Sequence, residues 1–201
     1  MTARIRLVND SDAEAIARIY RPAVEDTTIS FETVAPDREE IVRRIADTTQ
    51  SHPWLVCELD GVVVGYAYAS KHRVRAAYRW SVDTSVYVDA TCRRCGIGRG
   101  LYVSLFSVLS AQGFFNAYAG IALPNPASVG LHESVGFRPI GVYQRVGYKL
   151  GAWQDVGWWQ VFLKPHDASP GEPLSLVEVQ RLPGWRTLLA RGESVIRPSS
   201  G

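Results

Sequence analysis

Two hydrophobic periodicities divide most of this chain into strands and helices. Strand-like runs, in which apolar residues alternate or β-branched and aromatic side chains cluster, occupy residues 3–8, 54–59, 62–70, 80–89, 115–123, 137–146 and 153–163. Asp60-Gly61 separates the second run from the third and predicts a tight hairpin. Helical spacing fills several of the intervals between the runs. This order predicts an α/β (α+β) fold, with a mixed central sheet of about seven strands flanked by helices.

Four helices are expected between these strands. Asn9-Asp10-Ser11 supplies N-caps for the first helix, and Pro36-Asp37 opens the second. The third helix stops at Gly113. The fourth begins after Pro124-Asn125 and stops at Gly136.

The chain changes character after Lys164. Residues 166–173, HDASPGEP, carry the turn-forming residues that are typical of a linker. Residues 177–189 have the pattern of a helix, but Pro183-Gly184 would break it. We therefore expect one domain at residues 1–165 and a C-terminal extension at residues 166–201, made of a linker and a short helix.

Composition limits the partners and the location. The net charge is only +2, so the basic surface that nucleic acid requires is not expected. No apolar run reaches about 18 residues, and no signal-peptide pattern is expected, which argues against a membrane partner. Three cysteines do not make a disulfide framework, and this favours a cytoplasmic location.

One strand-to-helix connection has the pattern of an anion site. The run from Arg93 to Gly98 reads R-R-C-G-I-G. Glycines allow positive φ and a close backbone approach, so that successive N–H groups can point at phosphate oxygens. Arg94 and Arg99 add charge at the rim. The run lacks the Lys-Ser/Thr of a nucleotide triphosphate loop and the third glycine of a dinucleotide-binding turn. A solvated basic turn without a ligand is the alternative.

A second block lies one strand further along the chain. It runs from Asn125 to Phe137 and reads NPASVGLHESVGF. Asn125 can bond amides at the turn into the helix, and Ser128 can face the same cleft.

At this separation the two blocks resemble the acetyl-CoA site of the GCN5-related N-acetyltransferase (GNAT) superfamily, in which an R/Q-x-x-G-x-G/A turn holds the pyrophosphate. Within the superfamily the chain is similar to the phosphinothricin and methionine sulfoximine N-acetyltransferases, over residues 3–163. The shared stretches lie at residues 53–56, 66–69, 75–80, 86–88, 111–114, 123–125, 131–133, 153–157 and 159–160.

The resemblance implies the GNAT fold, with the fourth and fifth strands splayed apart and acetyl-CoA in the gap. The strand before the turn would bind the pantetheine through Val86, Tyr87 and Val88, and Asn125 and Ser128 would hold the far end of the cofactor arm. The turn would hold the pyrophosphate through Arg93, Arg94, Cys95, Gly96, Ile97, Gly98, Arg99 and Gly100. No metal is expected.

The implied reaction needs a base, because a neutral amine must attack the thioester. The family places a carboxylate, usually Glu, at the start of the central strand, and this chain has Asp83 there. Asp is one methylene shorter, which favours a bridging water, and a carboxylate that merely caps the strand is the alternative. His132 lies where many GNAT enzymes carry a Tyr near the cofactor sulfur. It would protonate the departing thiolate or assist the base, and a helical histidine with satisfied hydrogen bonds is its alternative.

The acceptor implied by the resemblance is a small amino-acid-like amine with its own carboxylate or phosphinate. Arg73, Arg75 and Tyr78 would lie on the loop that faces the cleft mouth, and Phe31 on a connector that closes over it. Arginine can bind a carboxylate through two hydrogen bonds. A solvated basic loop is the alternative for these residues.

Other functions stay open at this point. One is a module that binds acetyl-CoA without catalysis, since Asp replaces the usual Glu and the C-terminal extension is unmatched. Another is acetylation of a peptide N-terminus or an aminoglycoside, although the chain has no acidic stripe for a polycationic drug. The resemblance to enzymes of herbicide or antibiotic resistance does not make detoxification the physiological role, because such enzymes are expected to acetylate several amino-acid analogues.

The last strand predicts an oligomer. Trp153, Trp158, Trp159 and Phe162 provide more large apolar surface than one sheet face needs, which predicts a homodimer. Cys92 and Cys95 form a C-x-x-C pair inside the turn. No second pair exists for zinc, so coincidence is favoured over a metal or redox role.

Overall fold

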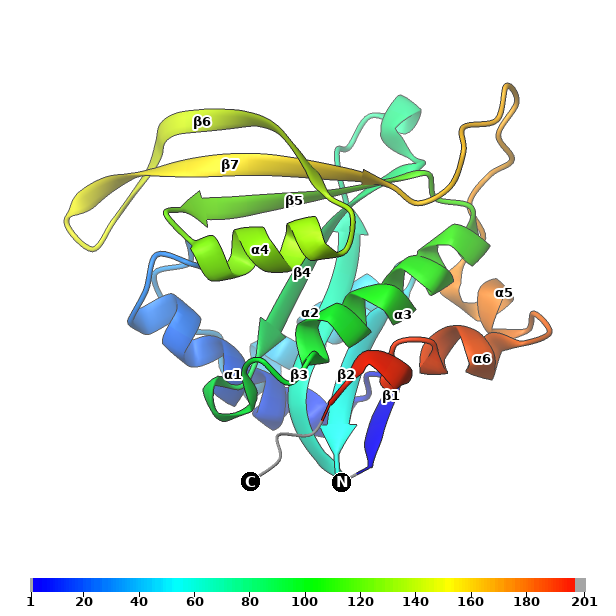
Figure 1. Cartoon of the computed structure of the whole chain (residues 1–201), viewed down its shortest axis with the longest axis horizontal. Helices are drawn as coiled ribbons and strands as arrows, with labels where there is room; N and C mark the ends of the chain where they lie inside the picture. The colour runs from blue at the N-terminus through cyan, green and yellow to red at the C-terminus, as the bar shows by residue number, and fades with distance from the viewer. Residues whose placement is uncertain (1, 198–201) are drawn as a thin grey trace.

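A mixed sheet of seven strands organises the residues that the structure describes, 2–197 of the 201-residue chain (Figure 1). In this computed structural model the strands lie in the order β1-β2-β3-β4-β5-β7-β6. Neighbouring strands are antiparallel except β4 and β5, which are parallel. The strands are β1 (Ala3–Leu7), β2 (Trp54–Leu59), β3 (Val62–Lys71), β4 (Ser81–Val88), β5 (Asn116–Leu123), β6 (Arg138–Lys149) and β7 (Ala152–Phe162). The predicted mixed α/β sheet is confirmed.

Helices cover both faces of this sheet. Side chains alternate along a strand, so Trp54 of β2 packs with α1 and α2 while Leu55 packs with α3 on the other face. Figure 1 shows α5 and α6 beside α3. The helices are α1 (Ala13–Glu25), α2 (Arg38–Thr49), α3 (Ile97–Gln112), α4 (Pro126–Ser134), α5 (Leu176–Gln180) and α6 (Trp185–Ala190).

The parallel neighbours β4 and β5 stay paired over a short distance only. Ser81, Val82 and Asp83 pair with residues 116–118 of β5. Beyond Asp83 the two strands diverge (Figure 1). Because backbone N–H and C=O groups need partners, the free edge of β4 is a place for a ligand to bind. The splay expected between the fourth and fifth strands is confirmed.

The β6–β7 hairpin is longer than the sequence predicted. Its pairing shifts register between Tyr143 and Gly147, and Arg145 within this bulge has φ +49°. The backbone N–H of Arg145 donates to Asp155 Oδ1 at 2.7 Å, which holds the bulge in place. The strand therefore continues to Lys149 rather than ending at the predicted residue 146. A bulge held by a cross-strand carboxylate has no signature in hydrophobic periodicity.

The C-terminal extension packs against the rest of the fold. The helical pattern at residues 177–189 is divided into α5 and α6, as the Pro183-Gly184 break predicted. Gly192 N–H donates to Ser104 Oγ of α3 at 3.0 Å, and Glu193 Oε1 accepts from Ile5 N–H of β1 at 2.8 Å. Arg197 N–H donates to the Cys95 carbonyl at 2.9 Å, next to the Gly-rich turn. The domain boundary at residue 165 stays a prediction.

We expect Gly192→Ala to loosen this packing. A Cβ on Gly192 would lie 1.8 Å from the Gly100 carbonyl oxygen of α3, so the extension must move away from the helix. Such overpacking costs about 1–3 kcal/mol of unfolding free energy, which denaturant titration measures.

The matched control for this variant is Gly171→Ala. It makes the same change in the same extension, where an added Cβ meets nothing within 4 Å. A control that loses as much stability as Gly192→Ala would contradict the packing argument.

Candidate active site

The Gly-rich turn connects β4 to the N-terminus of α3. Arg94 has φ +62° and Gly96 has φ +78°, and Gly96 is the N-cap of the helix. The N–H groups of a first helical turn have no partner inside the helix, and α3 is 16 residues long. Arg93, Arg94 and Arg99 are all exposed beside this turn. These features together make a site for an anion.

Several residues predicted in this turn face the protein instead. Cys95 and Ile97 are buried in the core. A Cβ on Gly98 would lie 2.9 Å from Leu131 of α4, and one on Gly100 would lie 2.7 Å from the Gly192 carbonyl. These residues set the shape of the turn, so any contact with a ligand would come from their backbone.

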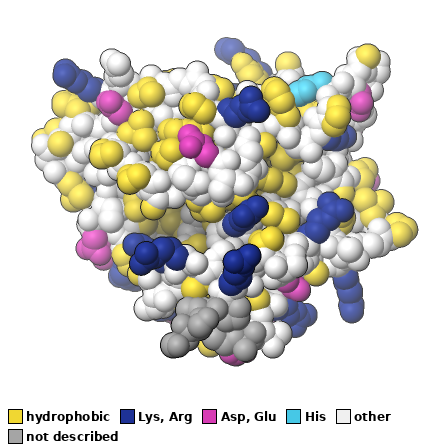
Figure 2. Space-filling model, in the orientation of Figure 1, with side chains coloured by type: hydrophobic (Ala, Val, Ile, Leu, Met, Phe, Trp, Pro, Cys, Tyr) yellow, Lys and Arg dark blue, Asp and Glu magenta, His cyan; other side chains and the backbone are white. Residues whose placement is uncertain are grey.

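The anion site lies on a basic part of the surface. Figure 2 shows several Lys and Arg side chains on the face that carries α3 and α4, whereas hydrophobic surface gathers over the β6–β7 hairpin. A local cluster of positive charge attracts phosphate even when the net charge of the whole chain is small.

The strand before the turn presents two different faces. Val86 and Val88 pack toward α3, and both are half-buried. Tyr87 points the opposite way, where its ring stacks on Tyr66 at 5.3 Å and meets the edge of Tyr20 at 4.8 Å. The Tyr87 side chain therefore belongs to the α1 packing, and only its backbone borders the splay.

Asn125 and Ser128 lie at the start of α4. The Asn125 side chain caps this helix by accepting a hydrogen bond from Ser128 N–H at 3.1 Å. The Ser128 carbonyl accepts a further bond from the His132 ring at 2.7 Å. Both predicted residues thus fix the helix that flanks the turn.

Asp83 lies where the splay begins. Its partner across the parallel pair is Tyr118, the last in the register. The Asp83 Oδ1 atom is 2.6 Å from His72 Nδ1, and Oδ2 is 3.9 Å from the Arg73 guanidinium. Burial raises the pKa of the Asp83 carboxyl above its usual 3.8, and the contacts with His72 and Arg73 oppose that increase. A carboxylate at this place can hold or take a proton.

His72 is the residue that sequence reasoning missed. Its ring stacks on Tyr118 with 4.3 Å between centroids, and it meets Tyr78 and Trp158 at an angle. No local sequence pattern pointed to it, because its place depends on how β3 pairs with β4. Ser70 pairs with Asp83 in this antiparallel pair, so His72, two residues beyond Ser70, lies on the same face and diagonally next to Asp83.

His132 lies in the core between α4 and α3. Its Nδ1 donates to the Ser128 carbonyl, because a carbonyl oxygen can only accept. Its Nε2 therefore accepts from the Tyr102 hydroxyl at 2.7 Å. Burial lowers the pKa of the His132 ring below its usual 6.5. This geometry keeps the ring neutral, with both nitrogens occupied.

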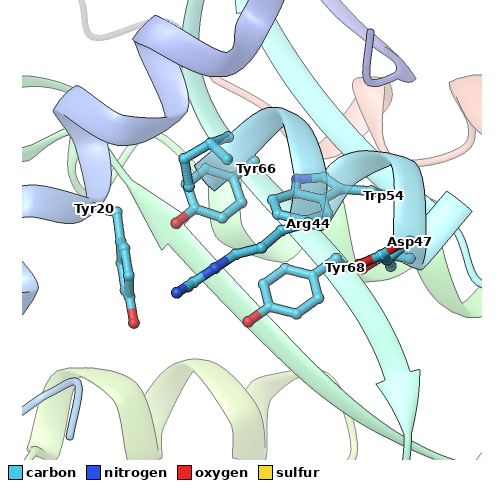
Figure 3. Close-up of a pocket in the computed structure, with 8 residues that line it drawn as sticks. Tyr20, Arg44, Asp47, Trp54, Tyr66 and Tyr68 are labelled. Atoms are coloured by element: carbon cyan, nitrogen blue, oxygen red, sulfur yellow. The ribbon is translucent and has the colours of Figure 1, made fainter. Parts of the chain in front are cut away.

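Two cavities open on the face of the sheet that carries Asp83. The first, of about 190 Å³, is lined by Tyr20, Ile41, Arg44, Asp47, Thr48, Trp54, Tyr66 and Tyr68. Figure 3 shows the Arg44 side chain extending between the rings of Tyr66 and Tyr68 toward Tyr20. The second, of about 250 Å³, is lined by His72, Arg73, Tyr118, Ile140, Gly141, Tyr143 and Trp158. Tyr68 pairs with Ser85, two residues from Asp83 on the same face, so Asp83 lies beside both cavities.

The predicted substrate residues are only partly brought together. Arg73 lies over the Trp158 ring at 5.7 Å, and Tyr78 contacts the ring of His72. Phe31 packs against Gly147 of the β6–β7 hairpin, at the other side of the site. Arg75 is exposed, and its side chain makes no hydrogen bond or ion pair with residues 2–197.

The α1–α2 loop that carries Phe31 is held by buried and partly buried polar contacts. Arg44 makes two hydrogen bonds to the Glu32 carboxylate, at 2.7 and 2.9 Å, and the Tyr20 hydroxyl donates to Glu32 at 2.8 Å. Lys149 of β6 donates to the carbonyls of Val24 and Ser30, both at 2.6 Å. Phe31 is thereby fixed between this loop and the hairpin.

Glu32→Gln should make the stability of the folded protein depend less on pH. The Arg44 guanidinium holds the pKa of the Glu32 carboxyl below its usual 4.5. A carboxyl whose pKa is lowered on folding contributes its stability above the unfolded value and loses it as pH falls through the folded value. The melting temperatures of wild type and Glu32→Gln should therefore differ most near neutrality and converge as pH falls below 4.5. A constant difference between pH 7 and pH 3 would argue against this ion pair.

Comparisons with known proteins show which family this chain resembles in sequence and fold. Residues 5–158 match the model of the acetyltransferase (GNAT) domain. The chain is 38% identical over 174 residues to a phosphinothricin N-acetyltransferase of Streptomyces viridochromogenes, an alignment that covers 86% of this chain and 95% of that protein. It is 34% identical over 165 residues to an L-methionine sulfoximine/L-methionine sulfone acetyltransferase of Salmonella typhimurium, covering 82% and 96%.

A solved structure extends the likeness to three dimensions. A phosphinothricin acetyltransferase from Sinorhizobium meliloti, crystallised in complex with acetyl-CoA, superposes with a TM-score of 0.81 at 34% identity, covering 87% of this chain and 96% of that one. Within residues 2–197, no group of three or more His, Cys, Asp or Glu side chains is arranged to hold a metal ion. The same residues include no helix long and apolar enough to cross a bilayer.

Proposed function

The chain belongs to the GNAT acetyltransferase family and is an acetyl-CoA-dependent transferase, and we propose that it acetylates the primary amine of a small amino-acid-like molecule. The observation that carries this proposal is the opening of the sheet at Asp83, where a partly buried carboxylate lies at the start of the splay and contacts His72, which lines a cavity. The named relatives act on phosphinothricin and on methionine sulfoximine or sulfone. Their names support an acceptor of the same class here.

The residues present fit acetyl-CoA as the co-substrate. The turn has two residues in the left-handed conformation before the α3 N-terminus, with three exposed arginines beside it, which suits a pyrophosphate. The unpaired edge of β4 beyond Asp83 offers backbone groups to the amides of pantetheine. When bound, acetyl-CoA supplies an activated acetyl thioester.

Asp83 supplies the negative charge that proton transfer from the amine requires. A group with this role needs to be near the reaction and partly shielded from water, and Asp83 is partly buried where the splay begins. His132 supports the site from the core, because both of its ring nitrogens are already engaged with Tyr102 and Ser128. Its role in our proposal is to hold α4 against α3.

The acceptor binds in the cavity beside Asp83. Arg73 is half-exposed at its rim and offers a guanidinium to the carboxylate or phosphinate of the acceptor. Tyr78 borders this region from the β3–β4 loop, where it contacts His72. Phe31 lies on the α1–α2 loop against Gly147 of β6. Arg75 lies outside it.

A screen of acceptors tests this function. Thiol release from acetyl-CoA is measured with phosphinothricin, methionine sulfoximine, methionine sulfone, the common L-amino acids and a short peptide with a free N-terminus. Turnover with amino-acid-like amines supports the proposal, and turnover with the peptide alone would replace it. Acetyl-CoA binding without turnover on any amine would identify a non-catalytic binding module.

We propose that two copies of the chain associate through the β6–β7 hairpin, and that the protein works in the cytoplasm, where its three cysteines stay reduced. Trp153 and Phe162 of β7 are 62% and 64% exposed. Trp159 does not contribute to this surface, because it is buried and donates to Glu133, and Trp158 turns toward His72. The exposed apolar residues of the hairpin are Ile140, Val142, Tyr143, Val146, Tyr148, Leu150, Trp153 and Phe162.

Trp153→Glu should convert the dimer into a monomer, because a charge buried in an apolar interface loses its hydration. Analytical ultracentrifugation at micromolar concentration measures the change. Val62→Glu is the matched control, since Val62 is also exposed but lies on β3, away from the hairpin. A wild-type protein that sediments as a strict monomer would exclude the dimer.

A further inference from the structure

We propose that His72 is the group that takes the proton from the acceptor amine, with Asp83 behind it to orient the ring and balance its charge. This inference rests on the proposed function and assigns its proton transfer to a particular atom, His72 Nε2. The sequence favoured a bridging water over direct contact between Asp83 and the amine. The structure places an imidazole against Asp83 instead.

The hydrogen bond between the two side chains fixes which nitrogen is available. The Asp83 carboxylate can only accept, so His72 Nδ1 carries the hydrogen of the 2.6 Å bond. In the neutral ring Nε2 then has a free lone pair. Nε2 makes no hydrogen bond with any residue in the described range 2–197.

The surroundings hold the ring in this orientation. Its face stacks on Tyr118 at 4.3 Å, while Tyr78 and Trp158 pack at its edges. The His72 side chain is only 11% exposed and lines the cavity of about 250 Å³. Because Tyr118 pairs with Asp83 at the last register before the splay, the ring lies over the point where the strands open.

Asp83 is less suited to act on the amine by itself. Its Oδ1 is occupied by His72, and its Oδ2 lies near the Arg73 guanidinium. A histidine is the side chain that exchanges protons most readily near neutral pH. A buried carboxylate behind it stabilises the imidazolium that forms, as in other acid–histidine pairs.

The proposed step balances as follows. His72 Nε2 first takes one proton from the ammonium form of the acceptor, which leaves a neutral amine. The amine nitrogen then forms a bond to the thioester carbonyl carbon, the carbon–sulfur bond breaks, and its electron pair leaves with the sulfur. The second proton lost by the nitrogen goes to the thiolate, and His72 returns its proton to water.

The charged and titratable groups that face His72 come from several elements. They are Asp83 of β4, Arg73 and Tyr78 of the β3–β4 loop, Tyr118 of β5 and Tyr143 of β6. Burial raises the pKa of the Tyr118 hydroxyl above its usual 10.0, so this hydroxyl stays neutral in the working range. Asp83 and Arg73 are therefore the charges that act on the ring.

Three substitutions at one position test the proposal with the acceptor found in the screen. We expect His72→Gln and His72→Phe each to lower kcat by about 100-fold or more, with the KM for acetyl-CoA unchanged. His72→Phe keeps an aromatic ring stacked on Tyr118. A loss of activity in this variant is therefore due to the missing proton transfer and not to missing stacking. Added imidazole should restore activity to His72→Ala, which a structural role would not allow. His52→Gln is the control, because His52 stacks on Phe114 away from the site.

A fourth variant tests why this chain uses a histidine. Asp83→Glu brings back the longer carboxylate usual in the family, so His72→Gln should cost less activity in that background than in wild type. His72→Phe with full activity, or no imidazole rescue, would overturn the proposal while leaving the acetyltransferase function intact. A wild-type protein that acetylates no amine would overturn both.

Discussion

Asp83→Asn is expected to lower kcat by about 100- to 10,000-fold, the range that general bases contribute, while the KM for acetyl-CoA stays near wild type. Asparagine has the same size and keeps an oxygen for the 2.6 Å contact with His72, so the geometry is retained. What disappears is the negative charge. Steady-state kinetics with the acceptor from the screen measure both constants.

The pH profile gives the Asp83 prediction a second readout. Burial raises the pKa of the Asp83 carboxyl above 3.8, and the reaction needs its ionised form. In wild type, kcat/KM should fall on the acid side as the Asp83 carboxyl takes up a proton. In Asp83→Asn that limb should change, because the carboxyl is no longer present.

Asp60→Asn provides the control. It makes the same change in the exposed β2–β3 turn, where Asp60 has φ +48°, a conformation that asparagine also adopts readily. An Asp83→Asn enzyme with normal kcat and weakened stability would mean that Asp83 only caps the start of β4, the alternative that the sequence left open.

The contrast between Asp83 and His72 shows which residues sequence patterns can single out and which they cannot. Asp83 was found because the strand, the Gly-rich turn and α3 are contiguous in the chain, and local patterns describe contiguous segments well. His72 lies at the other end of a loop, and its partner depends on the register of β3 with β4. A tight turn fixes the register of a hairpin, but the connection between β3 and β4 is a long loop at residues 72–80, whose sequence does not fix it.

His132 and Tyr87 show a second limit, which is the direction of a side chain. Both belong to stretches that the family resemblance singled out, yet His132 bonds with Tyr102 in the core and Tyr87 stacks on Tyr66. A motif identifies the segment that borders a ligand. Packing decides which of its atoms face that ligand, and the partners that decide it come from α1, α3 and β3.

The C-terminal extension could not be placed from its sequence for a related reason. Its short helices bury only Leu176 and Val179, against Val108 of α3. The rest of its fit depends on close backbone approaches to glycines, which apolar periodicity does not reveal. Gly100 and Gly192 are close because neither has a Cβ, and Gly96 lies against the Val195 carbonyl. The Gly-rich turn proposed to bind the pyrophosphate is therefore held on one side by the extension.

Gly96 in the Gly-rich turn is constrained both by its positive φ and by its closeness to the extension. We therefore expect Gly96→Ala to raise the KM for acetyl-CoA by about tenfold or more. A left-handed conformation costs an L-residue roughly 1–2 kcal/mol, and 1.4 kcal/mol corresponds to a factor of about 10 in binding. Gly96 has φ +78°, and an added Cβ would lie 2.5 Å from the Val195 carbonyl oxygen, so the turn must move or change conformation. The backbone N–H groups aimed at the pyrophosphate would move with it.

A truncated co-substrate separates this effect from general damage. S-acetyl-pantetheine lacks the pyrophosphate, so its KM should be nearly the same in Gly96→Ala as in wild type, whereas the KM for acetyl-CoA rises. Gly61→Ala is the matched control, because Gly61 has φ +83° with nothing within 4 Å of its added Cβ, in a turn remote from the site. It should lose stability without changing either KM. If Gly96→Ala weakened both co-substrates equally, the turn would not be the pyrophosphate site, and the arginines beside it would need another ligand.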